Sequence, residues 1–553
     1  MNKKVCSFPI LFALLALLIG TCAVVFPASA QAAPTSTGSI TVSGTVASSY
    51  DAYQIFSANV VDGDSDAKIA TDLAWASGAV RGAALPVLHS AGMSNSQATA
   101  QEAAEWLNTD SHLTSALSAQ LARSLQSSGA VPVALNAGTA AELPCGYWLI
   151  VADDDAIAQG EAGTAPIMTL VGGSAVTVKP KAATPKVSKH VLEDGTAAWQ
   201  KAADATVGDD LYWRLSATVP AGLTAYDTYT VRFVDTMGAG LDPSKVAASM
   251  RVYVAAGADG GFDAVACEGG NANSTPAKGW TDITSHCRVS IEGNAFTVRT
   301  GDLVAALGGA DAFTAGARVV AVYNAPLNSA CNHGIAKGNP NEVYLRYPRS
   351  PFADQSGDAG FTRTPSDDAC AYTWDLALTK RGSDGDKPLA GAVLSIADDR
   401  GRTLVADGTW DAEGKATVTT GEDGRVTVSG VDSGKLEVRE LKAPKGYTAF
   451  EGTRSVTVKA EGLDVDQVAA AKPKLTITAE SPLRADSADG STGSLEASLI
   501  NTPTGTPPSI TTGGFMPSTG DMAMYAAAAA AVAGAALIVV ALLVKRGGGS
   551  HKE

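Results

Sequence analysis

Short segments in which apolar and polar residues alternate recur along most of this 553-residue chain, and they constrain its fold more than any other feature. Over residues 183–372 they are separated by turns rich in Gly, Asp and Asn, and residues 373–505 repeat the pattern at smaller size. Alternation with a period of two is typical of strands that bury one face, and many short strands between such turns predict β-sandwiches. We therefore predict an all-β chain with sandwich domains at 183–372 and 373–505.

Residues 34–182 are predicted to form a first domain that combines strands with some helix. Alternating residues at its start and an apolar run at 146–151 indicate strands. A helical pattern extends from about Ser96 to Leu125, and Thr99 with Glu102 has the spacing of a capping box.

Both ends of the chain carry processing signals. Residues 1–33 hold two lysines, an apolar core and a small-residue site, which is typical of a secretory signal peptide. Residues 522–544 form an apolar run long enough to cross a bilayer as a helix, and the basic pair after it favours a cytoplasmic end. Residues 506–515 are predicted to be a flexible spacer before that run. The remainder is thus predicted to lie outside the cell.

Composition and motifs argue against several functions. The formal net charge of −15 is unfavourable for a nucleic-acid partner. No phosphate loop, nucleophile elbow or paired-carboxylate pattern stands out, and the histidines are scattered, so we predict no cofactor, no metal site and no turnover enzyme. The acidic turn at 62–66 could bind calcium, but a solvated loop is the preferred interpretation.

Five cysteines remain once the signal peptide is removed, in a compartment that permits disulfides. Cys267 with Cys287, and Cys331 with Cys370, are the pairs nearest in sequence, but sequence alone does not determine the connectivity. Because the count is odd, at least one thiol is unpaired or pairs between chains.

Residues 376–447 resemble a CnaB-type domain of surface adhesins and pilins. The resemblance is carried by LALTK at 376–380, PLAGA at 388–392 and LEVRELKAPKGY at 436–447, and the domain ends at LINTP, residues 499–503. In that family a lysine of the first strand bonds covalently to an asparagine of the last strand, and a glutamate assists. The resemblance implies these roles for Lys380, Asn501 and Glu440.

Strand parity is an independent test of this trio. Side chains two residues apart share one face of a strand. Lys380, Glu440 and Asn501 each continue an apolar row, so each is predicted to point into the core. The rows begin with Leu376 and Leu378, with Leu436 and Val438, and with Ala497 and Leu499. Burying one such polar group alone costs free energy, whereas burying all three together is expected if they react with one another.

The predicted chemistry follows from burial. Burial lowers the pKa of a lysine and raises the pKa of a carboxyl, because both shifts favour the neutral form. A neutral amine is a nucleophile. A protonated carboxyl can donate to the amide oxygen and relay the amine proton to the departing ammonia. Each molecule reacts once, so the chain is its own substrate and not a turnover enzyme.

Residues 183–372 resemble the middle domain of the same pilins, over 184–191, 234–241 and 339–347. The resemblance implies a bond between Lys189 and Asn341, with Asp235 as the acid. Strand parity supports this set, because each residue alternates with apolar neighbours. Asn339 is an alternative to Asn341.

The pentapeptide before the apolar run resembles the LPxTG sorting signal of Gram-positive surface proteins. It consists of Met516, Pro517, Ser518, Thr519 and Gly520, with Met in place of the usual Leu. The resemblance implies that a sortase cleaves the Thr519–Gly520 bond and transfers the chain to an amine.

A candidate for that amine lies at the end of the first domain. Backbone pilins that resemble this chain carry Val-Tyr-Pro-Lys there, and residues 178–181 read Val-Lys-Pro-Lys. The resemblance implies Lys181 as the polymerisation lysine, with Lys179 as an alternative. Parity places Thr177, Lys179 and Lys181 on the solvent face; a solubilising linker lysine is the other interpretation.

These features predict a sortase-assembled pilin of the backbone (major) type, built from tandem immunoglobulin-like, Cna-type β-sandwiches. The predicted joint runs from Thr519 to Lys181 of the next subunit, and internal Lys–Asn bonds stabilise two domains. Expected partners are a sortase, further copies, minor pilins and peptidoglycan, with host surface ligands as a further option and membrane anchoring only before sorting. The expected location is a wall-anchored pilus. A monomeric wall-anchored adhesin is the main alternative, and a minor pilin is another.

Overall fold

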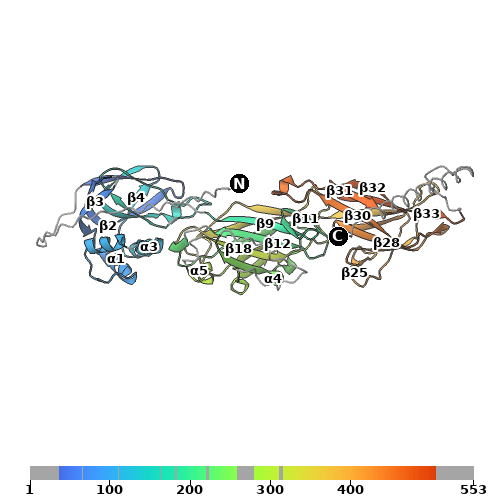
Figure 1. The fold of residues 1–553 in the computed structure, drawn as a ribbon, viewed down its shortest axis with the longest axis horizontal. Coiled ribbons are helices and arrows are strands. Elements are labelled where there is room, and N and C mark those ends of the chain that lie inside the picture. The colour runs from blue at the N-terminus through green and yellow to red at the C-terminus, as the bar shows by residue number, and fades with distance from the viewer. Residues whose placement is uncertain are drawn as a thin grey trace, which may run out of the picture.

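The computed structural model describes residues 36–505, except 65–66, 110, 164, 181–183, 220–222, 258–278 and 310–315. Strands dominate, and three lobes follow one another along an elongated molecule (Figure 1). The predicted all-β chain with some helix near its start is confirmed. The predicted signal peptide (1–33), spacer (506–515) and sorting segment (516–553) lie outside the described residues. Within 36–505, no described helix is long and apolar enough to cross a membrane.

The first lobe extends from β1 to β8 and holds two sheets. One sheet has the order β5 (Ala140–Pro144), β1 (Thr37–Val42), β8 (Val176–Val178). The other has the order β3 (Lys68–Trp75), β2 (Ser49–Asp62), β6 (Gly146–Ala152), β7 (Ile167–Val171), with β4 (Val133–Asn136) also paired to β2. Three helices pack on the second sheet: α1 (Gly78–Ser90), α2 (Ala100–Asn108) and α3 (Ser115–Ser127).

The helical pattern from Ser96 to Leu125 accounts for α2 and α3 but misses α1. The capping box of α2 is present: Thr99 Oγ1 accepts from the backbone of Glu102 at 3.2 Å, and Glu102 Oε2 accepts from the backbone of Thr99 at 2.7 Å. The helix α1 contains Pro86 and two glycines, which are poor helix formers. Its stability therefore comes from packing against the sheet, which a local pattern does not reveal.

The middle lobe extends from β9 to β21 and is a sandwich of two facing sheets. The first sheet has the order β10 (Ala198–Gln200), β9 (Lys186–Glu193), β12 (Tyr212–Val219), β18 (Ala317–Asn324), β14 (Arg251–Ala256), β15 (Thr281–Asp282). The second has the order β11 (Ala202–Asp204), β21 (Asp367–Tyr372), β19 (Asn339–Pro348), β13 (Arg232–Met237), β17 (Ala295–Arg299), β16 (Arg288–Glu292), with β20 (Phe361–Arg363) also paired to β19. The short helices α4 (Val246–Ser249) and α5 (Leu303–Ala306) lie in connections. The strand β19 is followed along the chain by β20 and β21 in the same sheet.

The last lobe extends from β22 to β33 and is a second sandwich. One sheet has the order β27 (Arg425–Val431), β22 (Trp374–Gly382), β33 (Ser494–Pro503), β29 (Tyr447–Thr448), with β32 (Leu483–Asp489) also paired to β33. The other has the order β25 (Trp410–Asp411), β24 (Thr403–Leu404), β23 (Val393–Ala397), β28 (Gly434–Lys442), β30 (Thr453–Glu461), β31 (Lys474–Ala479), with β26 (Val418–Thr419) also paired to β23. The first strand of the lobe, β22, and the last, β33, are parallel neighbours.

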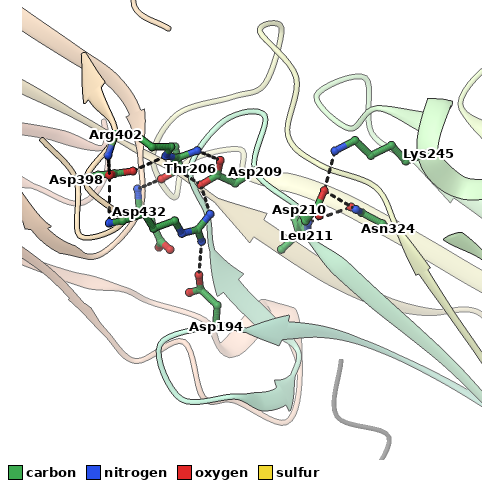
Figure 2. A network of polar contacts seen from close by, with 11 residues as sticks. Asp194, Thr206, Asp209, Asp210, Leu211, Lys245, Asn324, Asp398, Arg402 and Asp432 are labelled. Carbon is green, nitrogen blue, oxygen red and sulfur yellow. Dashed lines mark hydrogen bonds and ion pairs between the residues drawn. The ribbon is translucent and has the colours of Figure 1, made fainter. Parts of the chain in front are cut away.

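Polar contacts join the lobes. Between the first and middle lobes, Tyr347 Oη donates to Gly160 O at 2.8 Å. Between the middle and last lobes, Asp209 accepts from Arg402 Nη2 at 2.7 Å (Figure 2). Asp209 also accepts from Arg400 Nη1 at 2.9 Å. Only Thr373 separates β21 from β22, so the middle and last lobes are also joined by a very short connection.

The disulfide considered between Cys331 and Cys370 is not formed, and both residues are free thiols. Cys370 packs in the hydrophobic core of the last lobe, whereas Cys331 packs against the core of the middle lobe. The two thiols therefore lie against different cores. Burial raises the pKa of each thiol to about 11. Cys287 is also a free thiol, and its proposed partner Cys267 lies outside the described residues.

Candidate functional site

The last lobe brings Lys380, Glu440 and Asn501 together in its core. Lys380 lies on β22 and Asn501 on the adjacent β33, where the parallel register pairs Lys380 with Leu499 and Gly382 with Asn501. Glu440 lies on β28 of the facing sheet. The three residues are 0%, 7% and 2% exposed in the order Lys380, Glu440, Asn501. All three side chains therefore face inward, in the direction that the alternating rows indicate.

The amine of Lys380 and the carboxyl of Glu440 contact different atoms of the Asn501 side-chain amide. Lys380 Nζ is hydrogen-bonded to Asn501 Oδ1 and lies 3.2 Å from Glu440 Oε1. Asn501 Nδ2 donates to both carboxyl oxygens of Glu440, at 2.9 and 3.0 Å. The backbone N–H of Phe450 donates to Glu440 Oε2 at 3.1 Å and helps to hold the carboxyl in place. The amine thus lies beside the carbonyl, and the acid lies beside the nitrogen that would depart.

This acid position differs from one expectation. The carboxyl was expected to donate to the amide oxygen, but it contacts the amide nitrogen instead, and the oxygen is hydrogen-bonded to Lys380. The contact suits the other expected role, which is delivery of a proton to the departing nitrogen. Burial lowers the pKa of Lys380 to about 8, against the opposing effect of Glu440. At pH 7 about a tenth of the amine with such a pKa is neutral.

The middle lobe brings together Lys189, Asp235 and Asn341. Lys189 lies on β9 of one sheet, and the other two lie on the adjacent strands β13 and β19 of the facing sheet. All three are 0% exposed. The two candidate sites therefore differ in architecture, because this lysine and asparagine face each other across the sandwich, whereas those of the last lobe are neighbours in one sheet.

A tyrosine that the sequence argument missed completes the middle-lobe site. Tyr323 Oη accepts from Lys189 Nζ at 2.9 Å and from Asn341 Nδ2 at 2.8 Å. It donates to Asp235 Oδ2 at 3.1 Å, and the same carboxyl oxygen is hydrogen-bonded to Lys189 Nζ. Tyr323 lies on β18, of which nearly every residue is buried, so alternation could not distinguish the face that this tyrosine occupies.

Burial controls the protonation of this site. It lowers the pKa of Lys189 to about 8, although Asp235 opposes the shift. It also raises the pKa of Asp235 above its ordinary value and that of Tyr323 well above its ordinary value. Among the described residues, neither Asp235 Oδ1 nor Asn341 Oδ1 has a hydrogen-bond partner. Both pKa shifts of the amine and the carboxyl favour their neutral, reactive forms.

Of the other predicted site residues, the cysteines apart, Asn339 and Lys179 belong to the described part of the chain and the rest do not. Asn339 hydrogen-bonds with the backbone of Asn332 and of Ala371. At the end of the first lobe, Val178 is buried while Thr177 and Lys179 are exposed, as parity indicates. Outside the described residues lie Lys181, Met516, Pro517, Ser518, Thr519 and Gly520.

Comparison with known proteins identifies one domain by family. Residues 375–472 match the SpaA family, described as a prealbumin-like fold domain. They cover most of the last lobe, including Lys380 and Glu440. The last lobe is thus similar to prealbumin-like SpaA domains over these residues.

One curated relative is similar over part of its length. The Trypsin-resistant surface T6 protein of Streptococcus pyogenes serotype M6 is 30% identical over 143 residues, which are 24% of this chain and 24% of that protein. The chain thus spans about a quarter of the length of the curated relative that it matches.

Solved structures of pilins are similar at low identity. The T6 backbone pilin of serotype M6 Streptococcus pyogenes is 17% identical, with a TM-score of 0.45 over 85% of this chain and 98% of that chain. The full-length major pilin SpaD of Corynebacterium diphtheriae is 15% identical, with a TM-score of 0.41 over 85% and 98% of the two chains.

Proposed function

We propose that this protein is the backbone subunit of a covalently polymerised pilus on the surface of a Gram-positive cell. The observation that carries the proposal is the pair of buried lysine–acid–asparagine sets in consecutive lobes of an elongated molecule. A turnover enzyme needs an accessible substrate site, whereas the lysine, acid and asparagine of each set are buried and contact one another. The SpaA-type last lobe, and the partial similarity to a streptococcal surface protein, support the same reading.

The first part of the proposal is that each set forms an intramolecular isopeptide bond. The neutral lysine Nζ attacks Cγ of the asparagine, and the C–N bond to Nδ2 breaks. Nζ loses one proton and Nδ2 gains one, so ammonia leaves and the acid ends as it began. Lys380 would bond to Asn501 and Lys189 to Asn341, with Glu440 and Asp235 as the acids. Enforced proximity in the folded core favours the reaction.

Intact mass tests this part directly. Each bond removes one ammonia, so the purified protein should weigh about 17 Da less per bond than its sequence requires after signal-peptide removal. We expect a deficit that corresponds to two bonds, and cross-linked peptides that contain the named residues. A protein of full mass contradicts isopeptide formation.

The second part concerns assembly on the cell. We propose domains at 34–182, 183–372 and 373–505, export by the 1–33 signal, and sortase transfer of the Thr519 carbonyl to Lys181 of the next subunit. The exposed Lys179 beside the buried Val178 supports a chain that leaves the first lobe on its solvent side. Final attachment to peptidoglycan would leave the protein in a wall-anchored pilus.

Blots of native surface extracts test the assembly. We expect a ladder of high-mass species that collapses to one wall-linked band in the Lys181→Ala variant. Lys179→Ala is the matched control, because it removes a lysine two residues away and should keep the ladder. Collapse with Lys179→Ala alone would move the joint to that lysine. One band from the unmodified protein would instead favour the monomeric wall-anchored adhesin.

A further inference from the structure

Tyr323 occupies a fixed position between the two sheets of the middle lobe. It is 0% exposed and pairs in register with Trp213 of β12, so both rings face the core. The ring of Phe296, on the facing sheet, meets the Tyr323 ring edge-on with centroids 4.8 Å apart. These contacts hold the phenol oxygen against the reactive groups.

The Tyr323 hydroxyl contacts a reacting atom of each partner. It lies 2.9 Å from Lys189 Nζ, 2.8 Å from Asn341 Nδ2 and 3.1 Å from Asp235 Oδ2. In the last lobe the acid contacts the asparagine nitrogen directly. In the middle lobe the acid is an aspartate, one methylene shorter than glutamate, and the hydroxyl lies between it and the asparagine nitrogen.

We propose that Tyr323 is a fourth catalytic residue of the middle-lobe site, which passes a proton from Asp235 to the departing nitrogen of Asn341. This inference rests on the proposed isopeptide chemistry. Once Lys189 Nζ has added to Cγ, Nδ2 becomes an amine nitrogen whose electron pair can accept a proton. Tyr323 donates its proton to Nδ2 and receives one from Asp235, ammonia leaves with the electrons of the broken C–N bond, and Asp235 takes the proton that Nζ releases. Tyrosine and aspartate end in their starting forms, so the step is balanced.

The surroundings suit a relay of this kind. Burial keeps the phenol protonated through the neutral range, because its pKa lies well above the ordinary value. The hydroxyl both accepts and donates hydrogen bonds in the site, so reversal of the relay requires only rotation of its O–H bond.

A variant series can isolate this role. The full chain is made by cell-free synthesis, and the two cross-linked peptides, Lys189–Asn341 and Lys380–Asn501, are quantified over time by mass spectrometry. In Tyr323→Phe we expect the first bond to form roughly 100-fold more slowly, the range typical of a lost general acid. The second bond should form at the unmodified rate and acts as a control within the same molecule. Tyr347→Phe, which also removes a buried tyrosine hydroxyl from this lobe, should leave both rates unchanged.

The outcomes separate the two claims. An unmodified chain without the Lys189–Asn341 peptide overturns the bond itself, and the inference with it. An unmodified chain with the bond, and an equal rate in Tyr323→Phe, overturns the relay alone.

A second measurement does not depend on the folding of the phenylalanine variant. Fluorotyrosine retains the hydroxyl but is more acidic, so its incorporation should move the pH profile of the Lys189–Asn341 reaction to lower pH. The Lys380–Asn501 reaction, whose three members include no tyrosine, should keep its profile. Unchanged profiles for both bonds contradict the relay.

Discussion

At the scale of the residue, the last-lobe site depends on one carboxyl that touches the nitrogen to be expelled. In Glu440→Gln, the side chain keeps its shape and can still accept from Phe450, but it cannot deliver a proton. We expect the Lys380–Asn501 bond to form at least about 100-fold more slowly, so that freshly made protein is heavier by about 17 Da. Intact mass is the measurement.

The neighbouring acid on the same strand is a suitable control. Glu437 faces solvent on β28 and pairs with Lys435 at 2.8 Å. Glu437→Gln should therefore leave the mass deficit intact. A full deficit in freshly made Glu440→Gln protein would exclude Glu440 as the acid.

The proton count of the middle-lobe site predicts its pH dependence. A neutral Lys189 with a protonated Asp235 carries the same number of protons as the ion pair, so both belong to one macroscopic state, and burial raises the pKa of Asp235. That state loses its last proton as the pH rises through the pKa of Lys189, which is about 8. We expect the rate to fall by about tenfold per pH unit above that value, because the acid is then absent. Rates of bond formation at pH 7 and pH 9 test this; a faster reaction at pH 9 would mean that amine deprotonation alone limits the rate.

At the scale of the element, the two bonds would stabilise different units. The last-lobe bond joins neighbouring strands of one sheet, and its lysine and asparagine are 121 residues apart in sequence. A cross-link that closes a loop of about 100 residues contributes about 4–5 kcal/mol by restricting the unfolded chain. The middle-lobe bond would instead tie one sheet to the other.

We expect Glu440→Gln, in its unbonded form, to lower the free energy of unfolding of the last lobe by about 4 kcal/mol. Amide hydrogen exchange of β22 and β33 should report the loss, with the β9 and β19 amides unchanged as the internal reference. Equal protection in bonded and unbonded protein would show that the sheet alone stabilises these strands.

Particular elements show how far sequence reasoning reaches. Lys380, Glu440 and Asn501 could be expected in the core because each ends an apolar row with a period of two. Tyr323 could not, because β18 is buried on both faces and alternation carries no information there. The helix α1 depends on tertiary packing, and the separation of Cys331 from Cys370 depends on which hydrophobic core each side chain packs against.

At the scale of the whole molecule, the joint between the middle and last lobes relies on Asp209. Its carboxylate forms ion pairs with the guanidinium groups of Arg400 and Arg402, which belong to the last lobe. We expect Asp209→Ala to loosen this joint and to broaden the distribution of overall lengths measured by small-angle scattering. Added salt should change the effect little, because the Asp209 side chain is only 12% exposed and salt screens partly buried ion pairs weakly.

The adjacent residue provides the control. Asp210 pairs with Lys245 at 2.7 Å inside the middle lobe. Asp210→Ala should therefore leave the length distribution unchanged. An identical response of the two variants would mean that Asp209 does not hold the joint, which would leave it to the short β21–β22 connection and to the contacts of Asp204 with Trp374 and Ser433.

The parallel pairing of β22 and β33 has a mechanical consequence. In the proposed pilus, force enters the last lobe beyond β33 and leaves it through β22 into β21. With Lys380 joined to Asn501, that load passes from one strand to its neighbour and bypasses the 121-residue interval between them. The residues between Lys380 and Asn501 then carry no tensile force. The loops among them are free to diversify, or even to be cut by proteases, while the fibre remains continuous.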